Sequence, residues 1–189
     1  MAIYMGNENW WDDRFSGREK RLGKPEEKLV AWENRLLPGP VLDVACGQGR
    51  NAIYLASLGY SVTALDFSRV AITHLRELAK EAGVTIATVQ GDCQCRDTFV
   101  PLGMFQTIVV NHYRLTQEIV GELLSHLTPD GLLWINGFCR CPETNPNITT
   151  RDLLNVEDYM QYKERGYDVL TEQYETDLGE FVCIVIKAQ

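Results

Sequence analysis

The chain switches repeatedly between strand-like and helix-like patterns of apolar residues from residue 40 to about 137. Short apolar runs of strand type occupy 41–45, 60–67, 84–93, 105–113 and 132–137. Amphipathic segments with helical spacing occupy 26–37, 50–59, 69–83 and 116–127. Strands that alternate with helices are typical of a parallel sheet covered by helices on both faces. The pattern therefore predicts an α/β fold.

Capping residues mark several of these helices. Ser68 is expected to cap the start of the 69–83 helix, and Gly59 and Gly83 are expected to close two helix ends. The 26–37 helix places five apolar side chains on one predicted face: Leu29, Val30, Trp32, Leu36 and Leu37. A turn is expected at 128–131, before the fifth strand.

The last third of the chain has a different pattern. Residues 149–166 have helical spacing, and the segments 167–176 and 180–188 flank the turn residues Asp177, Leu178 and Gly179. Two apolar segments around such a turn indicate an antiparallel hairpin. Five parallel strands should therefore be followed by a helix and two antiparallel strands.

Length and charge narrow the possible partners. A chain of 189 residues is sufficient for one well-buried domain. Its net charge of -8 argues against a nucleic-acid partner, because phosphate backbones are bound by clustered Lys and Arg. The mixed-charge segment from Arg14 to Lys24 is interpreted as solvated, with a binding patch as the alternative. A small-molecule partner is expected.

The sequence contains no apolar run of the roughly 20 residues that a spanning helix needs, and its start has no basic segment followed by an apolar one. The prediction is a cytoplasmic protein with no membrane partner. No oligomeric state follows from the sequence.

Six cysteines include two C-x-C pairs, Cys93/Cys95 and Cys139/Cys141. Zinc ribbons usually use C-x2-C spacing, so free thiols and no metal site are predicted. Binding of a soft metalloid acceptor by both pairs is an alternative, although the strands before them should lie about 19 Å apart in the expected sheet. Cys46 and Cys183 are expected in the core.

The stretch "VLDVACGQGRNA" joins the first strand to the next helix. Gly47 and Gly49 allow a tight turn and a close approach of a ligand to the backbone. Asp66 and Asp92 stand at the tips of the next two strands, on the edge where open α/β sheets bind ligands. An acid about 20 residues after the glycines suits the two hydroxyls of a ribose.

A dinucleotide site is an alternative, because "GQGRNA" fits G-x-G-x-x-A. Asp43, four residues before Gly47, argues against this alternative because pyrophosphate gains nothing from a neighbouring acid. The chain also ends in a hairpin and has no second mononucleotide-binding half. An acid beside the turn suits a cationic ligand instead.

With D-x-x-x-G-x-G in "DVACGQG", the sequence resembles the class I S-adenosylmethionine-dependent methyltransferases over residues 38–189. The stretch "GQGRNAIYLASLGYSVTALDFS" and the early "WDDRF" resemble the small tellurite-resistance-type group. The resemblance implies a Rossmann-like three-layer sandwich with a mostly parallel seven-stranded sheet of order 3-2-1-4-5-7-6. Residues 1–37 would form an N-terminal lid or helical segment, and 38–189 the S-adenosylmethionine-binding domain.

The resemblance also implies which residues bind S-adenosylmethionine. Asp43 and the turn residues Ala45, Cys46, Gly47 and Gly49 would hold the methionine portion, and Asp66 the ribose hydroxyls. Phe67 would lie against the adenine, Asp92 and Cys93 would meet its edge, and Asn111 would flank the reactive end. Gln106 departs from an acid that is common in the family.

Catalytic candidates follow the fourth strand in "NHYR". Methyl transfer from a sulfonium is an in-line displacement that needs alignment and exclusion of water more than a catalytic side chain. His112 would take a proton from an oxygen or thiol acceptor and Arg114 would hold an acidic substrate, with Tyr113 between them. Purely structural roles for these residues are an equal alternative.

Aromatic residues precede the predicted domain. In the resembling group such a segment folds over the cofactor, so Trp11 and Phe15 would close the pocket and Arg14 would pair with the methionine carboxylate. Packing of Trp10 and Trp11 on the outer helices is the alternative. The leading prediction is a methyltransferase acting on a small molecule. A noncatalytic S-adenosylmethionine-binding protein and an NAD-dependent oxidoreductase are the other candidates.

Overall fold

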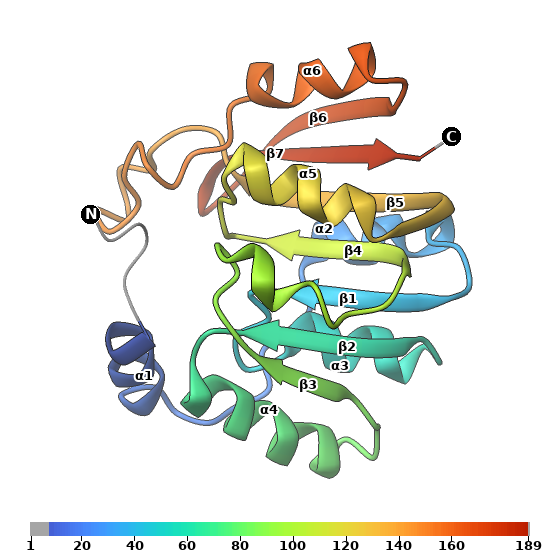
Figure 1. Cartoon of the computed structure of the whole chain (residues 1–189). Helices are drawn as coiled ribbons and strands as arrows, with labels where there is room; N and C mark the ends of the chain where they lie inside the picture. Colours follow the sequence, from blue (N-terminus) through green and yellow to red (C-terminus); the bar gives the residue numbers. More distant parts are fainter. Residues whose placement is uncertain (1–7, 189) are drawn as a thin grey trace.

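The seven strands form one mixed sheet of order β3-β2-β1-β4-β5-β7-β6 in the computed structural model, which describes residues 8–188 (Figure 1). The strands are β1 (Pro40–Val44), β2 (Ser61–Asp66), β3 (Ala87–Gln90), β4 (Phe105–Asn111), β5 (Leu127–Phe138), β6 (Asp168–Thr176) and β7 (Gly179–Lys187). The five strands β1 to β5 run parallel, whereas β7 pairs antiparallel with both β5 and β6. The predicted Rossmann-like fold and its closing hairpin are confirmed.

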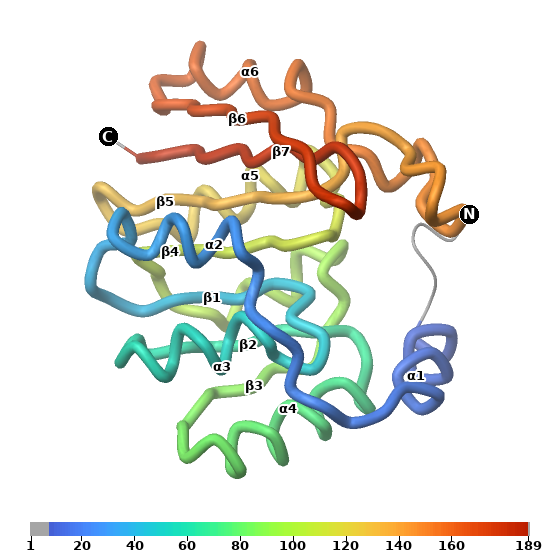
Figure 2. Tube along the Cα trace, turned by 180° about the vertical axis from the view of Figure 1, so that it is seen from behind, coloured from blue at the N-terminus to red at the C-terminus, as the bar shows by residue number. Residues whose placement is uncertain are grey.

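Helices cover both faces of the sheet. They are α1 (Glu8–Ser16), α2 (Glu27–Trp32), η1 (Glu33–Arg35), α3 (Arg50–Ser57), α4 (Arg69–Glu81), η2 (Arg96–Thr98), α5 (Gln117–Ser125) and α6 (Glu157–Glu164). Apolar side chains of α2, α3 and α4 form one core cluster, and those of α5 and α6 form another on the opposite face. Figure 2 shows α2 and α3 lying over the sheet. The helix α1 lies apart from these layers, beyond one end of the strands (Figures 1 and 2).

Local capping follows the sequence closely. The Ser68 hydroxyl accepts a hydrogen bond from the Ala71 amide at 3.1 Å, which caps α4. Gly59 and Gly83 adopt left-handed φ angles of 93° and 71° at the ends of α3 and α4. Cys46 and Cys183 are buried, as expected.

The structure differs from the sequence pattern at the 26–37 helix. The segment forms the short α2 followed by η1, and Leu29, Trp32 and Leu36 are buried. Val30 and Leu37 are 38% and 40% exposed, so their predicted place on the buried face is wrong. Leu37 follows the end of η1 and the extended residue Leu36, so it is not part of the helix that the pattern predicted.

Three other boundaries were predicted wrongly. Only Glu157–Glu164 of the 149–166 segment is helical, because the Leu154 amide donates to the Phe138 carbonyl of β5 at 2.8 Å and not to a carbonyl within the segment. The Asp152 carboxylate accepts from the Thr149 amide and hydroxyl, at 2.7 and 2.8 Å, in a single turn that does not continue as a helix. The strand β3 is shorter than 84–93. The 128–131 turn lies inside β5, where Asp130 has φ 61° and the register against β4 shifts.

No helix within residues 8–188 is long and apolar enough to cross a membrane.

Candidate functional site

A cavity of about 980 Å³ opens at the carboxyl ends of β1 and β4. Its wall includes residues of α1, the loop after β1, the ends of β4 and β5, and two distant segments, 144–152 and 177–178. Carboxyl ends of parallel strands meet at one edge of a sheet, where α/β folds bind ligands. This cavity is the candidate site.

The turn after β1 depends on glycine. Gly49 has φ 84°, and a Cβ on it would lie 2.6 Å from the Leu75 side chain. Gly47 has φ 56°, and a Cβ on it would lie 3.4 Å from the Phe15 ring. Ala45 also adopts a positive φ of 56°, which is uncommon for a residue with a Cβ. The backbone therefore bends sharply between β1 and α3 and forms part of the cavity wall.

Asp66 supports this turn from the tip of β2. One carboxylate oxygen accepts from the Gly47 amide at 2.7 Å, and the other accepts from the Ser68 amide at 2.9 Å. Burial raises the pKa of Asp66, and these amide donors oppose the increase. Each carboxylate oxygen has a further lone pair, so Asp66 can accept hydroxyl donors as well.

Asp43, on β1, also lines the cavity. Its side chain is 2% exposed, and its Oδ2 atom has no hydrogen-bond partner. Burial first, and then the charge of Asp66, raise the pKa of Asp43 to about 7. A buried acid oxygen without a partner is costly unless a ligand satisfies it. The position therefore suits a cationic or hydrogen-bond-donating ligand.

The helix α1 covers this edge of the sheet. Its Asp12 carboxylate accepts from the Ser68 hydroxyl at 2.5 Å and from the Val70 amide at 3.1 Å. Phe15 is buried over Gly47, and its ring stacks on Trp11 with 5.9 Å between centroids. Acids and aromatic rings thus hold α1 against the start of α4 and the glycine turn.

Two arginines on and just after α1 face the same cavity. The Arg14 guanidinium lies over the Trp10 and Trp11 rings, 5.2 and 5.8 Å from their centroids, and its buried Nε has no hydrogen-bond partner. Burial, followed by the charge of Arg14, lowers the pKa of Arg18. Like charges held close together beside a cavity suit an anionic group.

A polar cluster around Glu26 lies beside the cavity, to whose wall it contributes Arg50, Asn111 and His112. One oxygen of its carboxylate, Oε2, accepts from His112 Nε2 at 2.9 Å, from Arg50 at 3.0 Å and from Asn111 at 3.3 Å. Burial alone would raise the pKa of Glu26, but the hydrogen bond and charge of His112, the Arg50 charge and the Asn111 hydrogen bond lower it to about 2. Glu26 is therefore ionised.

Sequence reasoning missed Glu26 and gave Arg50 no role. Glu26 lies in a segment of mixed charge ahead of a helix, and nothing local distinguishes it from Glu27. Only the fold brings it to β4, across 85 residues of sequence.

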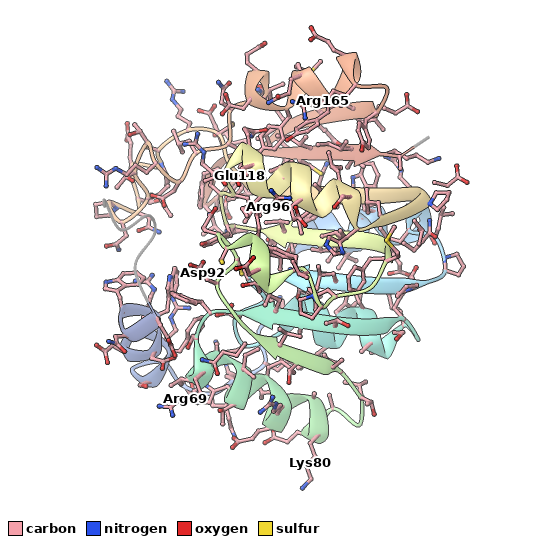
Figure 3. The ribbon with its side chains drawn as sticks, in the orientation of Figure 1. Arg69, Lys80, Asp92, Arg96, Glu118 and Arg165 are labelled. Atoms are coloured by element: carbon pink, nitrogen blue, oxygen red, sulfur yellow. The ribbon has the colours of Figure 1, made fainter. Side chains whose placement is uncertain are left out.

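The structure brings half of the predicted site residues to the cavity wall. These are Arg14, Asp43, Ala45, Cys46, Gly47, Asn111 and His112. Gly49 and Asp66 stand behind the wall and shape the glycine turn. Phe67, Asp92 and Cys93 lie beyond it, where Cys93 is buried and Asp92 accepts from the Gln94 amide at 2.8 Å. Figure 3 shows Asp92 near the sheet edge that α1 faces.

Tyr113 and Arg114 point elsewhere. The Tyr113 hydroxyl accepts from Gln94 at 3.5 Å, and Arg114 pairs with Asp158 of α6 at 3.5 Å. Neither residue is part of the cavity wall. Their catalytic roles stay predictions.

The cysteine pairs lie in mixed surroundings. Cys93 is buried and Cys139 half-buried, whereas Cys95 and Cys141 are exposed. Within residues 8–188, no three His, Cys, Asp or Glu side chains are grouped so as to hold a metal ion.

Similarity to known proteins bears on this site. Residues 41–131 match a family described as "Methyltransferase domain". A ubiquinone biosynthesis O-methyltransferase from Rickettsia akari is 31% identical over 181 residues, which are 87% of this chain and 72% of that protein. The corresponding protein of Rickettsia felis is 31% identical over 70% of this chain, and the chain spans 57% of its length.

A probable S-adenosyl-L-methionine-dependent methyltransferase, TehB from Haemophilus influenzae, is 44% identical over 92 residues, which are 49% of this chain and 30% of that protein. Among solved structures, the one described as "Conversion of a Disulfide Bond into a Thioacetal Group during Echinomycin Biosynthesis" superposes with a TM-score of 0.77 at 19% identity. The superposition covers 96% of this chain and 93% of that one, and at this identity it shows the fold alone.

Proposed function

Because the chain belongs to the class I S-adenosylmethionine-dependent methyltransferases, we propose that it catalyses in-line methyl transfer to a small-molecule acceptor. S-adenosylmethionine is the cofactor of this family, and when bound it supplies a methyl group activated by a sulfonium charge. One observation carries the proposal for this cavity: the buried, unpartnered carboxylate oxygen of Asp43 beside the glycine turn.

Asp43 fits the cationic end of this cofactor. A carboxylate that faces a positive group in a nearly water-free site gains a charge-assisted hydrogen bond or a Coulomb partner. The same contact would favour the ionised form of Asp43 over the protonated form. Asp43 would thereby hold the methionine portion, together with the backbone of Ala45, Cys46 and Gly47.

Other residues would hold the remaining parts of the cofactor. Arg14, whose Nε has no partner, would pair with the methionine carboxylate. Asp66 would accept from the ribose hydroxyls, and Phe67, Asp92 and Cys93 would contact the adenine. Asn111 lines the cavity near Glu26 and would flank the reactive end.

We propose that the described part of the 1–37 segment acts as a lid and that 38–189 form the cofactor-binding domain. Phe15 lies on the glycine turn and Trp11 stacks on it, so α1 would exclude water from the reacting atoms. The cost of misalignment is high in such reactions, because positioning supplies much of the rate enhancement.

The proposed acceptor is small and acidic. The cavity volume of about 980 Å³ is within the range of ligand sites. Arg18, Arg21 and Arg151 also line it, although the chain as a whole carries a net charge of -8. Local arginines in an acidic protein favour a small anion over a polyanion such as RNA.

Calorimetric titration and a turnover screen test this proposal. Adenosylhomocysteine should bind and NADH should not, whereas binding of NADH alone would favour the oxidoreductase alternative. Turnover should then appear within a panel of thiols, phenols, amines and metalloid oxyanions, each acidic acceptor being matched with its neutral ester. Binding without turnover would favour the noncatalytic alternative, and methylation of an RNA transcript would contradict the small-molecule acceptor.

A cytoplasmic location stays a prediction. Fractionation of cells that express the protein tests it.

A further inference from the structure

His112 occupies an unusual position immediately after β4. It has a positive φ of 55°, and its amide donates to the Asn136 carbonyl at 2.7 Å. A residue with a Cβ in this region is strained and persists only where its surroundings hold it. The imidazole lies 5.6 Å from the Phe138 ring and 5.3 Å from the Phe181 ring, between centroids. His112 and Phe138 both line the cavity.

The Glu26 carboxylate fixes one side of this imidazole. It comes from the segment between α1 and α2, and its side chain is 14% exposed. The Glu26 amide donates to the Asn51 side-chain oxygen at 2.9 Å, so both the backbone and the carboxylate of Glu26 are held. Arg50, from the start of α3, binds the same oxygen as His112.

A second chain of hydrogen bonds holds Asn111, the third donor to Glu26. The Tyr174 hydroxyl donates to Asn136 Oδ1 at 2.8 Å, and Asn136 Nδ2 donates to Asn111 Oδ1 at 3.1 Å. Asn136 is fully buried. Four elements therefore converge on the Glu26 carboxylate: the α1–α2 segment, the start of α3, β4 and, through Asn136, the closing hairpin.

We propose that Glu26 is a positioning residue that holds His112 with its proton on Nε2, so that Nδ1 is free to accept the proton of an acceptor hydroxyl or thiol. An ionised carboxylate only accepts hydrogen bonds, so the facing ring nitrogen must carry the hydrogen. The other ring nitrogen of a neutral imidazole then keeps its lone pair. The inference rests on the proposed methyltransferase function and specifies its acceptor class.

The proton and electron pairs balance in this step. An acceptor oxygen or sulfur lone pair forms the bond to the methyl carbon as the carbon–sulfur bond of the sulfonium breaks, and that pair stays on the sulfur. The acceptor proton passes to His112 Nδ1 and then to solvent. A hydroxyl or thiol gains from such a base because its proton must leave as the bond forms, whereas a neutral amine attacks with its existing lone pair.

The molecule contains a matched control pair. Glu122 and His126 lie one helical turn apart at the end of α5, with 3.6 Å between Glu122 Oε1 and His126 Nε2. His126 Nδ1 lies 3.0 Å from the Gly103 carbonyl oxygen, so Nδ1 must carry the hydrogen there. Glu122 also pairs with Arg96, which lies on the outer surface beside α5 (Figure 3). This second pair predicts the opposite tautomer and lies outside the cavity wall.

Nitrogen-15 NMR of the full chain labelled at histidine tests the positioning without any turnover. The chain has three histidines, so each ring can be assigned by substitution. The wild-type protein should show His112 as the Nε2–H form and His126 as the Nδ1–H form. Glu26→Leu, which removes the acceptor oxygen, should shift His112 toward the other form, and Glu122→Leu should leave His112 unchanged. An unchanged His112 tautomer in Glu26→Leu would overturn the proposal.

Steady-state kinetics with the acceptor identified in the turnover screen provide a second test of the proposal. Glu26→Gln should lower kcat by roughly 10-fold to 100-fold, because His112 would lose part of its effect as a general base. KM and the affinity for adenosylhomocysteine should change little. Glu26→Asp should recover part of the loss, and Glu122→Gln should retain the wild-type kcat. A loss confined to cofactor affinity or thermal stability would show that Glu26 only anchors the lid and would overturn the proposal.

Ligand binding and acceptor choice distinguish a failure of the proposed function from a failure of the His112 assignment. If wild-type protein binds no adenosylhomocysteine, the proposed function fails. If it binds and turns over an amine but no hydroxyl or thiol, the proposed function holds and the assignment of His112 as a base fails.

Discussion

The two ends of the parallel strands each carry a cavity, and the polar groups around them differ. At the amino ends of β1 and β2, a cavity of about 430 Å³ lies beside Glu33, Leu36 and Tyr60. There the Tyr54 hydroxyl donates to Glu33 and the Tyr60 hydroxyl donates to the Leu36 carbonyl. At the carboxyl ends, Asp43 Oδ2 and Arg14 Nε are buried without partners.

The difference favours the cavity at the carboxyl ends as the ligand site. Folding normally pairs buried polar groups, and leaving an ionisable one unpaired costs stability. Thr107 Oγ1 and Trp134 Nε1 are also buried and unpartnered, but they are neutral groups on β4 and β5 outside the cavity wall. Among the residues that the structure describes, the two buried ionisable side chains with an unpartnered atom, Arg14 and Asp43, both line the cavity at the carboxyl end.

The largest expected effect is on the pH dependence of stability in the absence of ligand. In the folded protein Asp43 keeps its proton up to about pH 7, whereas its ordinary pKa is 3.8. The folded state thus binds more protons in this window, so the free energy of unfolding falls as the pH rises from about 4 to about 7. Asp43 contributes on the order of 4 kcal/mol to this fall.

Urea unfolding of the wild-type protein and of Asp43→Asn across that window measures the effect. The variant should lose the Asp43 contribution, and Glu33→Gln, at the other cavity, should keep it. If the free energy of unfolding depended on pH in the same way in the wild-type protein and in Asp43→Asn, a raised pKa of Asp43 would be contradicted.

Gly49 and Gly59 allow a second comparison, because Gly49 lies at the carboxyl ends of the parallel strands and Gly59 lines the cavity at their amino ends. Gly49→Ala should cost about 2–4 kcal/mol of stability, because the φ of 84° is unfavourable and the new methyl group meets Leu75 at 2.6 Å. Gly59→Ala should cost only about 1 kcal/mol, since its φ of 93° is similar but no atom lies within 4 Å. Equal losses in chemical denaturation would show that the glycine turn is not tightly packed.

Arg14→Ala should give a smaller effect, on ligand affinity. Losing one charged partner of a carboxylate should weaken adenosylhomocysteine binding by roughly 10-fold, measured by calorimetry. Arg35→Ala is the matched control, because Arg35 also stacks on a tryptophan, 4.6 Å from the Trp32 centroid, but lies away from the cavity. Unchanged affinity in Arg14→Ala would remove its predicted role.

Much of the fold was predictable because its signals are local. Gly59, Gly83 and Ser68 cap helices through backbone conformations and bonds within a few residues, and the structure has them as expected. The family resemblance also holds, including the likeness to the TehB type, and with it the strand order. The 149–156 stretch was mispredicted because the Leu154 amide donates to the Phe138 carbonyl of β5, a tertiary contact that the local sequence does not indicate.

The site was predictable only in part. Asp43 and the glycine turn stand in a contiguous motif, so their position on a strand end could be inferred. Glu26 meets Asn111 and His112 through tertiary structure alone, and no periodicity indicates such a meeting. Tyr113 and Arg114 follow His112 directly, yet the bend at His112 turns them toward Gln94 and α6.

The Asp43 carboxylate is expected to receive the cationic part of S-adenosylmethionine. Calorimetry in buffers of different ionisation enthalpy, near neutral pH, tests it by counting the protons released when S-adenosylmethionine binds. Since binding would favour the ionised form, the wild-type protein should release a proton that Asp43→Asn does not release, and the variant should bind at least about 10-fold more weakly. Equal affinity and equal proton release in the two proteins would contradict this role of Asp43.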